Sequence, residues 1–348
     1  TWLRGTRVVV EGTGFARPGI GTMTATIRAT AGDSQVSFRI DLAVDSETRG
    51  SFTVDDAVLA LLPVDGPAMT GTLSLDRSGE RQTVATTQVA FEATVLSRLT
   101  PMLSQVLPSM AYPGETMSVS GDGFLMQGEG ITLVRISGQF KQQGYSSTVI
   151  KQGLYLPLEV TDRNNATFRL TPDLLGLLPV AFDGEMAVLN QLAGEELPGN
   201  TLPGIRITMG LPFISAIAPA SIRRGQELVF EGRGFLGLDG DLGTTTFIAF
   251  TGTKTTAAQT TTYMDANPLV FVPDRIVGNT VARMVVRVQA GGDGGEDNFA
   301  IHPGVLEGTF TPHVLFGDKM VVGQGIPARL EVGRQVQVVY VRFMPTFE

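Results

Sequence analysis

Cysteine is absent from the 348 residues of this sequence, and histidine occurs only twice. The missing thiols exclude disulfide scaffolds, thiol catalysis, iron–sulfur clusters and cysteine-bound zinc. His302 and His313 each stand beside a proline, without a partner that would make either a catalytic base or part of a transition-metal site. No nucleophile motif is present either. We therefore expect no catalytic residues, no enzymatic activity and no cofactor.

Charge is also scarce, because Asp, Glu, Lys and Arg make up 17% of the residues, against about 25% in typical soluble domains. The formal net charge is −8 and no basic run occurs, so we expect no nucleic-acid partner. No stretch approaches the roughly 20 apolar residues of a membrane span, so we expect no membrane insertion. The first residues also show no basic segment leading into an apolar run, so we expect no signal peptide in this sequence.

Glycine is abundant, with 42 residues, and a glycine-containing pattern occurs three times along the chain. Each copy has a glycine, an alternating apolar stretch, the signature Gly-x-Gly and a phenylalanine. The first glycines lie 109 and 111 residues apart, which is a domain-sized period. The repeated positions are Gly5, Gly12, Gly14 and Phe15; Gly114, Gly121, Gly123 and Phe124; and Gly225, Gly232, Gly234 and Phe235.

Alternation within each copy predicts a strand with one buried face. Val8 and Val10 in the first copy correspond to apolar residues in the other two, whereas Glu11 corresponds to polar ones. The Gly-x-Gly signature suits a turn or bulge with positive φ, where a β-carbon would clash. The phenylalanine that follows is expected to anchor the core.

Two further features recur in the same order. Residues 101–108 and 212–219 are short apolar runs bracketed by prolines, which predicts edge strands because proline cannot donate to a ladder. The first copy has no such run. Later in each unit comes a phenylalanine-containing strand, in which we align Phe52, Phe168 and Phe271.

The proline-bracketed run followed by Gly-x-x-φ-x-φ-x-Gly-x-Gly-Phe (φ apolar) resembles the IPT/TIG family of immunoglobulin-like domains. Residues 212–235 match best. The resemblance implies an all-β protein of three tandem Ig-like β-sandwiches plus a C-terminal β-rich extension. The expected domains are 1–98, 99–209 and 210–303, the first without its first strand. Residues 304–348 are either a β-rich extension or the start of a further domain.

Acidic loops are the only metal-binding candidates in the sequence. Asp293, Glu296 and Asp297 bring together the hard oxygen donors that calcium uses, but without EF-hand spacing. A solvated hairpin tip explains the same residues. The run from Gly232 to Gly237 formally matches a dinucleotide fingerprint, but no helix is expected after it. We interpret it as a structural turn.

Three tandem sandwiches joined by short, proline-containing linkers predict a stiff rod. We interpret the chain as a structural and interaction protein with protein partners, in a bacterial cell-surface, secreted or filamentous assembly. Such domains also accompany exported enzymes. The alternative is therefore a non-catalytic spacer or binding region of a larger exported enzyme such as a hydrolase.

The missing strand of the first copy has a consequence for assembly. A sandwich without an edge strand exposes backbone groups and apolar side chains that another strand can pair with. Residues 335–343 meanwhile read as a surplus strand. One hypothesis is that this strand, or one from a partner, completes the first copy of a neighbouring molecule and builds a polymer. The alternative is that the strand lies upstream of Thr1, while residues 335–343 pack on their own domain.

Overall fold

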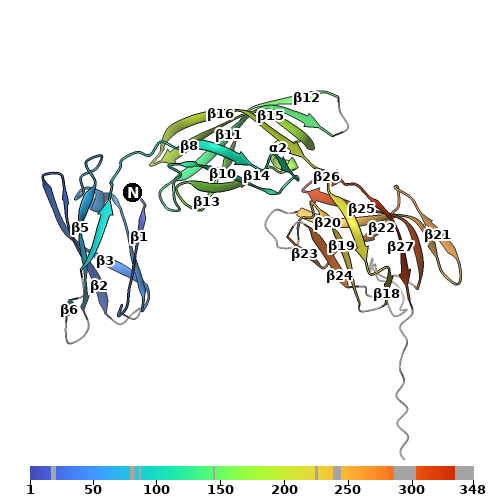
Figure 1. The fold of residues 1–348 in the computed structure, drawn as a ribbon, viewed down its shortest axis with the longest axis horizontal. Coiled ribbons are helices and arrows are strands. Elements are labelled where there is room, and N and C mark those ends of the chain that lie inside the picture. Colours follow the sequence, from blue (N-terminus) through green and yellow to red (C-terminus); the bar gives the residue numbers. More distant parts are fainter. Residues whose placement is uncertain are drawn as a thin grey trace, which may run out of the picture.

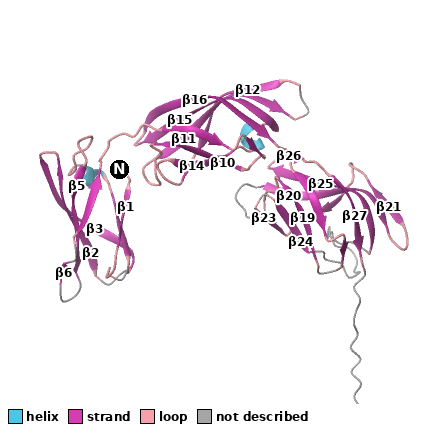
Figure 2. Cartoon of the chain, viewed as in Figure 1, coloured by secondary structure: helices cyan, strands magenta, loops and turns pink. Residues whose placement is uncertain are grey.

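Three β-sandwiches in sequence make up this protein, whose structure is a computed structural model. It describes residues 1–16, 21–78, 83–85, 88–143, 146–223, 226–237, 244–278, 280–285 and 303–333. The protein is all-β, as predicted, and the two helices of the described residues are single turns (Figure 2). Figure 1 shows the middle sandwich between the other two, which hang to the same side, so that the chain forms an arch. The expected rod is therefore bent.

Domain 1 has one continuous network of strands in the order β1-β4-β3-β2-β5-β6, with β7 paired to β5. The long strand β3 pairs with β2 through residues 34–42 and with β4 through residues 43–46, so it joins the two layers. The elements are β1 (Arg7–Glu11), β2 (Thr22–Ala31), β3 (Ser34–Ser46), β4 (Arg49–Thr53), α1 (Asp56–Leu59), β5 (Met69–Ser78), β6 (Thr83–Ala85) and β7 (Val89–Ala93).

Domain 2 has two separate sheets, in the orders β13-β14-β10-β8 and β12-β11-β15-β16-β9. The proline-bracketed run forms β8 at the edge of the first sheet, as predicted. The elements are β8 (Met102–Leu107), β9 (Met110–Ala111), β10 (Thr116–Asp122), β11 (Ile131–Gln142), β12 (Thr148–Pro157), β13 (Glu159–Val160), β14 (Asn165–Arg169), α2 (Pro172–Leu175), β15 (Pro179–Leu192) and β16 (Glu195–Met209).

Domain 3 repeats this arrangement, with sheets β17-β19-β24-β23 and β18-β27-β25-β20-β21; β22 and β26 pair with β20 and β25. The second proline-bracketed run is again an edge strand, β17. The elements are β17 (Phe213–Ala218), β18 (Ser221–Ile222), β19 (Glu227–Arg233), β20 (Thr244–Thr255), β21 (Thr260–Tyr263), β22 (Leu269–Phe271), β23 (Arg275–Val277), β24 (Val281–Val285), β25 (Gly304–Phe316), β26 (Lys319–Val322) and β27 (Ile326–Val332).

The third domain extends beyond residue 303, where the sequence analysis ended it. β25 pairs with β20 over twelve positions, and Leu306, Phe310 and Leu330 belong to the core of domain 3. The alignment of Phe271 with Phe52 and Phe168 was also wrong, because Phe271 occupies a different strand of its sandwich. Phe271 lies in β22, which pairs with β20, whereas the strands of Phe52 and Phe168 pair with β1 and β10. The counterpart in domain 3 is β24, which pairs with β19.

Each sandwich has its own apolar core, and the repeated phenylalanines lie in these cores. Phe15, Phe124 and Phe235 are buried, with exposed fractions of 3%, 0% and 0%. The second glycine of each Gly-x-Gly has positive φ, with values of +82°, +73° and +78° for Gly14, Gly123 and Gly234. The signature therefore makes the left-handed turn that returns the chain to the core. Gly225 lies outside the described residues.

We predict that replacing Phe235 by alanine lowers the free energy of unfolding of domain 3 by about 3–5 kcal/mol, because a fully buried ring is lost and the cavity is only partly refilled. Denaturant unfolding of the whole chain, followed by a probe in domain 3, measures this change. Met264→Ala in the same domain is the control, since Met264 is 67% exposed and its loss is expected to cost less than about 0.5 kcal/mol. Equal effects of the two substitutions would contradict the assigned core.

Candidate functional site

The described residues bring together no group of three or more Asp, Glu or His side chains that would hold a metal ion. The calcium candidates Asp293, Glu296 and Asp297, and also His302, lie outside the described residues. Among the described residues, no helix is long and apolar enough to cross a bilayer.

Two basic side chains have a lowered pKa, but they lie far apart. Burial lowers the pKa of His313, which Asp265 partly opposes, and burial also lowers the pKa of Lys254. His313 stacks on Phe247 with 5.0 Å between ring centroids. Lys254 lies opposite Leu306 in the β20–β25 pair, about 23 Å from His313 along the strand at 3.3 Å per residue. The two side chains do not form a catalytic pair.

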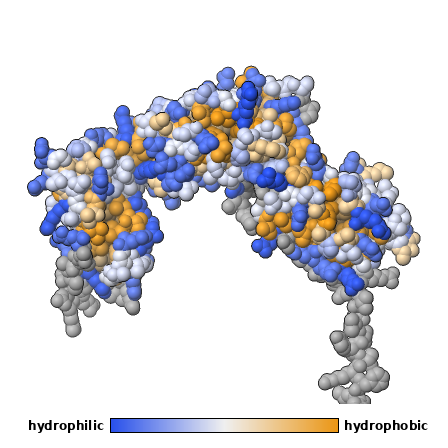
Figure 3. Space-filling model, in the orientation of Figure 1, coloured by the Kyte–Doolittle hydropathy of each residue, from blue (hydrophilic) through white to orange (hydrophobic). Residues whose placement is uncertain are grey.

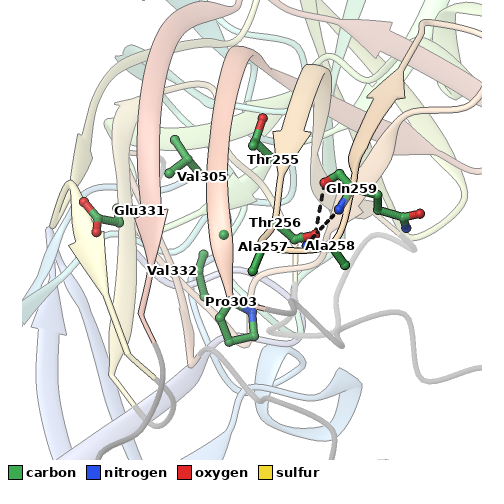
Figure 4. A pocket seen from close by; sticks show the side chains of 10 residues that line it. Thr255, Thr256, Ala257, Ala258, Gln259, Pro303, Val305, Glu331 and Val332 are labelled. Atoms are coloured by element: carbon green, nitrogen blue, oxygen red, sulfur yellow. Dashed lines mark hydrogen bonds between the residues drawn. The ribbon is translucent and has the colours of Figure 1, made fainter.

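A depression of about 670 Å³ lies at the end of domain 3 where β20 ends and β25 begins (Figure 4). Its lining comes from the turn after β20, the start of β25 and the end of β27. Of the described residues that line it, only Glu331 is charged. The hydroxyl of Thr256 donates to the carbonyl of Gln259 and accepts from the amides of Ala258 and Gln259. This hydroxyl therefore stabilises its own turn.

The most elaborate contacts outside the three cores are the joints between domains. Joint 1, between domains 1 and 2, has an apolar centre of Leu3, Leu125 and Leu192, against which Leu96, Leu99 and Leu197 pack. Leu3 belongs to domain 1, Leu96 and Leu99 to the linker and the others to domain 2. Burial of each of the three central leucines contributes about 1.5–3 kcal/mol, so the joint is held by the same effect as a domain core.

A buried carboxylate lies at one side of joint 1. The Glu129 side chain is fully buried, and it pairs with Arg163 through both carboxylate oxygens. It also accepts a hydrogen bond from the amide of Met126 at 2.9 Å and from the hydroxyl of Thr6, which lies in domain 1. A buried charge needs such partners, since an unpaired one is costly. The Thr6 hydroxyl thus completes a polar cluster of domain 2.

The linker of joint 1 is fixed on both sides. In domain 1, the amide and the hydroxyl of Ser97 donate to the two oxygens of Asp65, and these hydrogen bonds lower the pKa of Asp65. In domain 2, the buried amide group of Asn190 donates to the carbonyl of Leu99 at 2.7 Å and to that of Gly123 at 2.9 Å. The linker is therefore part of both domains.

Joint 2, between domains 2 and 3, has a shorter linker than joint 1 and more aromatic contacts. Only residues 210–212 separate β16 from β17, and the buried residues Val314, Phe316 and Val321 of domain 3 pack against Leu178 of domain 2 and Leu211 of the linker.

Tyr112 of domain 2 forms the second half of joint 2. Its ring centroid lies 6.4 Å from that of Phe213 and 5.9 Å from the guanidinium carbon of Arg233. Gly210 and Gly234 make room for the ring, because a β-carbon at either position would lie within 3 Å of it.

The first glycine of the repeated pattern lies in a joint in both described copies. Gly5 has a φ of +86°, and a β-carbon there would lie 2.0 Å from the carbonyl oxygen of Gly128 in domain 2. Gly114 has a φ of +76°, and its β-carbon would lie 2.7 Å from Leu236 and 2.8 Å from Phe316 in domain 3. Gly128 and Leu236 follow the Gly-x-Gly-Phe signature of their domains. The repeat therefore specifies the joint as well as the sandwich.

Sequence reasoning located these glycines but assigned them to the strand. It did not identify Thr6, Glu129 or Arg163, since they lie 123 and 34 residues apart and belong to no repeat. Tyr112 carried one usable signal, because it is one of only five tyrosines and follows directly on the strand after a proline-bracketed run.

Comparison with known proteins gives only distant similarities. No protein-family model and no curated protein sequence matches the chain, so membership of the IPT/TIG family stays a prediction. Among solved structures, SGBP-B from a complex xyloglucan utilization locus in Bacteroides uniformis is 15% identical, with a TM-score of 0.28 and coverage of 94% of this chain and 96% of that one. The FN1–FN3 domains of chicken CNTN1 are 8% identical, with a TM-score of 0.19 and coverage of 94% and 95%.

A protein solved with a xylogluco-oligosaccharide is 13% identical, with a TM-score of 0.20; the alignment covers 92% of this chain but only 57% of that protein. Likeness at this level does not bear on function, and the assignment of three sandwiches rests on the strand pairing of the chain itself.

We predict that Gly5→Ala opens joint 1, because the added β-carbon would meet the backbone oxygen of Gly128. Gly14→Ala is the matched control. It has nearly the same φ, +82°, but no atom within 4 Å of the new β-carbon, so both variants carry a backbone strain of about 1–2 kcal/mol. Because the chain lacks cysteine, spin labels attach only at the residues introduced by Asp33→Cys and Glu159→Cys. They report the distance between domains 1 and 2. Broadening of that distance is expected for Gly5→Ala alone.

Proposed function

We propose that this protein is a non-catalytic structural and interaction protein, an arched spacer of three Ig-like sandwiches. It would hold its two end domains at a set distance and angle in a bacterial cell-surface, secreted or filamentous assembly. The observation that supports this most is the construction of the joints, where a repeated glycine, an apolar cluster and polar contacts from both domains meet.

A flexible tether would need none of these contacts. Interfaces between domains of one chain usually permit relative motion unless they are well packed. Here Thr6 helps to satisfy the buried Glu129 carboxylate, and separating the domains would remove that bond and expose Leu3 and Leu125. Bending joint 1 therefore costs both apolar burial and a charge-assisted hydrogen bond.

The extracellular or cell-surface location belongs to this proposal, and its support is the resemblance of the repeat to domains of bacterial surface and secreted proteins. Protein partners are proposed on the same ground. An accessory region of a larger exported enzyme would use the same spacer. The packed joints are therefore compatible both with a structural assembly and with such an enzyme.

We predict that both inter-domain distances are single and narrow in solution. Spin-label pairs at positions 33 and 159 and at positions 159 and 329 measure them by pulsed electron paramagnetic resonance; all three positions are exposed. Each distribution is expected to be as narrow as that of a control pair within domain 2, such as positions 159 and 195. Broad or multiple distances in the unsubstituted joints would contradict the spacer function.

A further inference from the structure

His313 has a partner that the sequence analysis did not identify. Its ring nitrogen Nδ1 lies 3.5 Å from the thioether sulfur of Met320. A thioether and an imidazole are the softest donors available to this chain, since it has no cysteine. The other histidine, His302, and the surplus strand 335–343 of the sequence analysis lie outside the described residues.

The pairing of β25 with β26 brings the two side chains to one face of the sheet. His313 lies opposite Val322, and Leu315 lies opposite Met320. His313 and Met320 are therefore diagonal neighbours, and such neighbours in an antiparallel pair are within reach of long side chains. The contact between nitrogen and sulfur follows from the register of the hairpin.

Both the backbone and the ring at this place are held by packing. Val314 and Val321 follow His313 and Met320 in the sequence, and they are buried in the apolar cluster of joint 2 on the other face of the hairpin. The ring of His313 stacks on Phe247, with 5.0 Å between centroids and 22° between planes. A binding site needs its ligands positioned in this way by the surrounding structure.

The face that carries the two donor atoms is open to solvent. Met320 is 41% exposed and Val322 is 36% exposed. Figure 3 shows apolar side chains at the surface of domain 3 where Figure 1 places β26. A small ion can therefore reach the sulfur of Met320 from solution without displacing a core residue.

Charge near His313 favours a cation. Burial lowers the pKa of His313, and the carboxylate of Asp265 opposes this effect electrostatically. The neighbouring Lys319 points to the other face of β26, because side chains alternate along a strand, and it pairs with Asp318 at 3.3 Å. A cation beside the ring would therefore gain from the negative charge of Asp265.

We propose that His313 and Met320 are two ligands of a binding site for the monovalent copper ion, Cu(I). Thioether sulfur is a soft ligand that selects Cu(I), and imidazole also binds copper. The two donor atoms, 3.5 Å apart, fit one metal ion at an angle of about 110°, if its bonds are about 2.0 Å to nitrogen and about 2.3 Å to sulfur, as in zinc sites. The other coordination positions face solvent and would take a small ligand from solution.

The donor set separates Cu(I) from other common metal ions. Zinc is bound by thiolate, imidazole and carboxylate groups, and calcium and magnesium by oxygen. The described residues bring together no three Asp, Glu or His side chains that would hold such an ion. Cu(I) accepts a low coordination number, so a thioether and an imidazole are a substantial part of its site. The inference is independent of the spacer function, which the distances between spin labels test separately.

The first test measures the transfer of Cu(I) from its coloured complex with bicinchoninate to the whole chain, without oxygen and with ascorbate present. A pH of about 7.5 keeps an ordinary imidazole neutral. The unsubstituted chain is expected to remove Cu(I) from the complex, and Met320→Leu and His313→Phe are each expected to weaken its binding by about tenfold or more. Met264→Leu is the matched control, because Met264 is 67% exposed in the same domain, and it should leave the affinity unchanged.

Failure of the unsubstituted chain to remove Cu(I), or equal affinity of all the variants, would overturn the proposal. An equal loss in Met264→Leu would do the same, and so would binding of Zn²⁺ as tight as that of Cu(I), because soft donors would then play no part. Thermal midpoints check the folding of the variants. Met320→Leu should keep the midpoint of the parent chain, since the two side chains have similar volumes and Met320 is exposed.

The second test needs no substitution at the site, so it stands even if a variant fails to fold. Ag(I), which prefers sulfur and is not oxidised or reduced here, is added to the whole chain with ¹³C in the methionine methyl groups and ¹⁵N in the histidines. The methyl signal of Met320 and the Nδ1 signal of His313 are expected to shift together, with one midpoint. Shifts of other methionines without these two signals, or movement of Nε2 in place of Nδ1, would overturn the assignment of the ligands.

Discussion

Close approach between backbones is the constraint on which this structure depends most. In domains 2 and 3 the carbonyl oxygens of Met102 and Phe213 lie where a β-carbon of Gly121 or Gly232 would be. Gly5 permits an equally close backbone contact between domains 1 and 2, and Gly114 makes room for the side chains of Leu236 and Phe316 between domains 2 and 3. Only glycine allows such an approach, so one short repeated pattern sets the edge of domains 2 and 3 and the fit of domains 1 and 2 to the domain that follows each.

Much of the fold was predictable because the sandwiches are built from local signals. Alternation, a Gly-x-Gly turn and proline-bracketed runs each act within about ten residues, and they identified β8, β17 and the buried phenylalanines correctly. The prediction failed in the second half of domain 3. There the sequence around Phe271 resembles the strands that contain Phe52 and Phe168, but the strand of Phe271 pairs with a different partner. Only the strand pairing in the structure distinguishes the two cases.

The candidate site was less predictable, since it consists of contacts between domains. Glu129 gives no sign in the sequence that a threonine 123 residues earlier completes its hydrogen bonds. The sequence does not distinguish a glycine that permits a turn from one that permits a bulge or a contact between domains. The role of each glycine becomes clear only when the structure shows which atom a β-carbon at that position would meet. This explains why the positions were identified and their roles were not.

The three domains should therefore differ in stability, although they share one pattern. Domains 2 and 3 each gain a buried aliphatic side chain from their edge strand, Leu103 or Ile214, which contributes about 1.5–3 kcal/mol. Among the described residues of domain 1, β1 pairs with β4 alone, and Val8 and Val10 are half-buried.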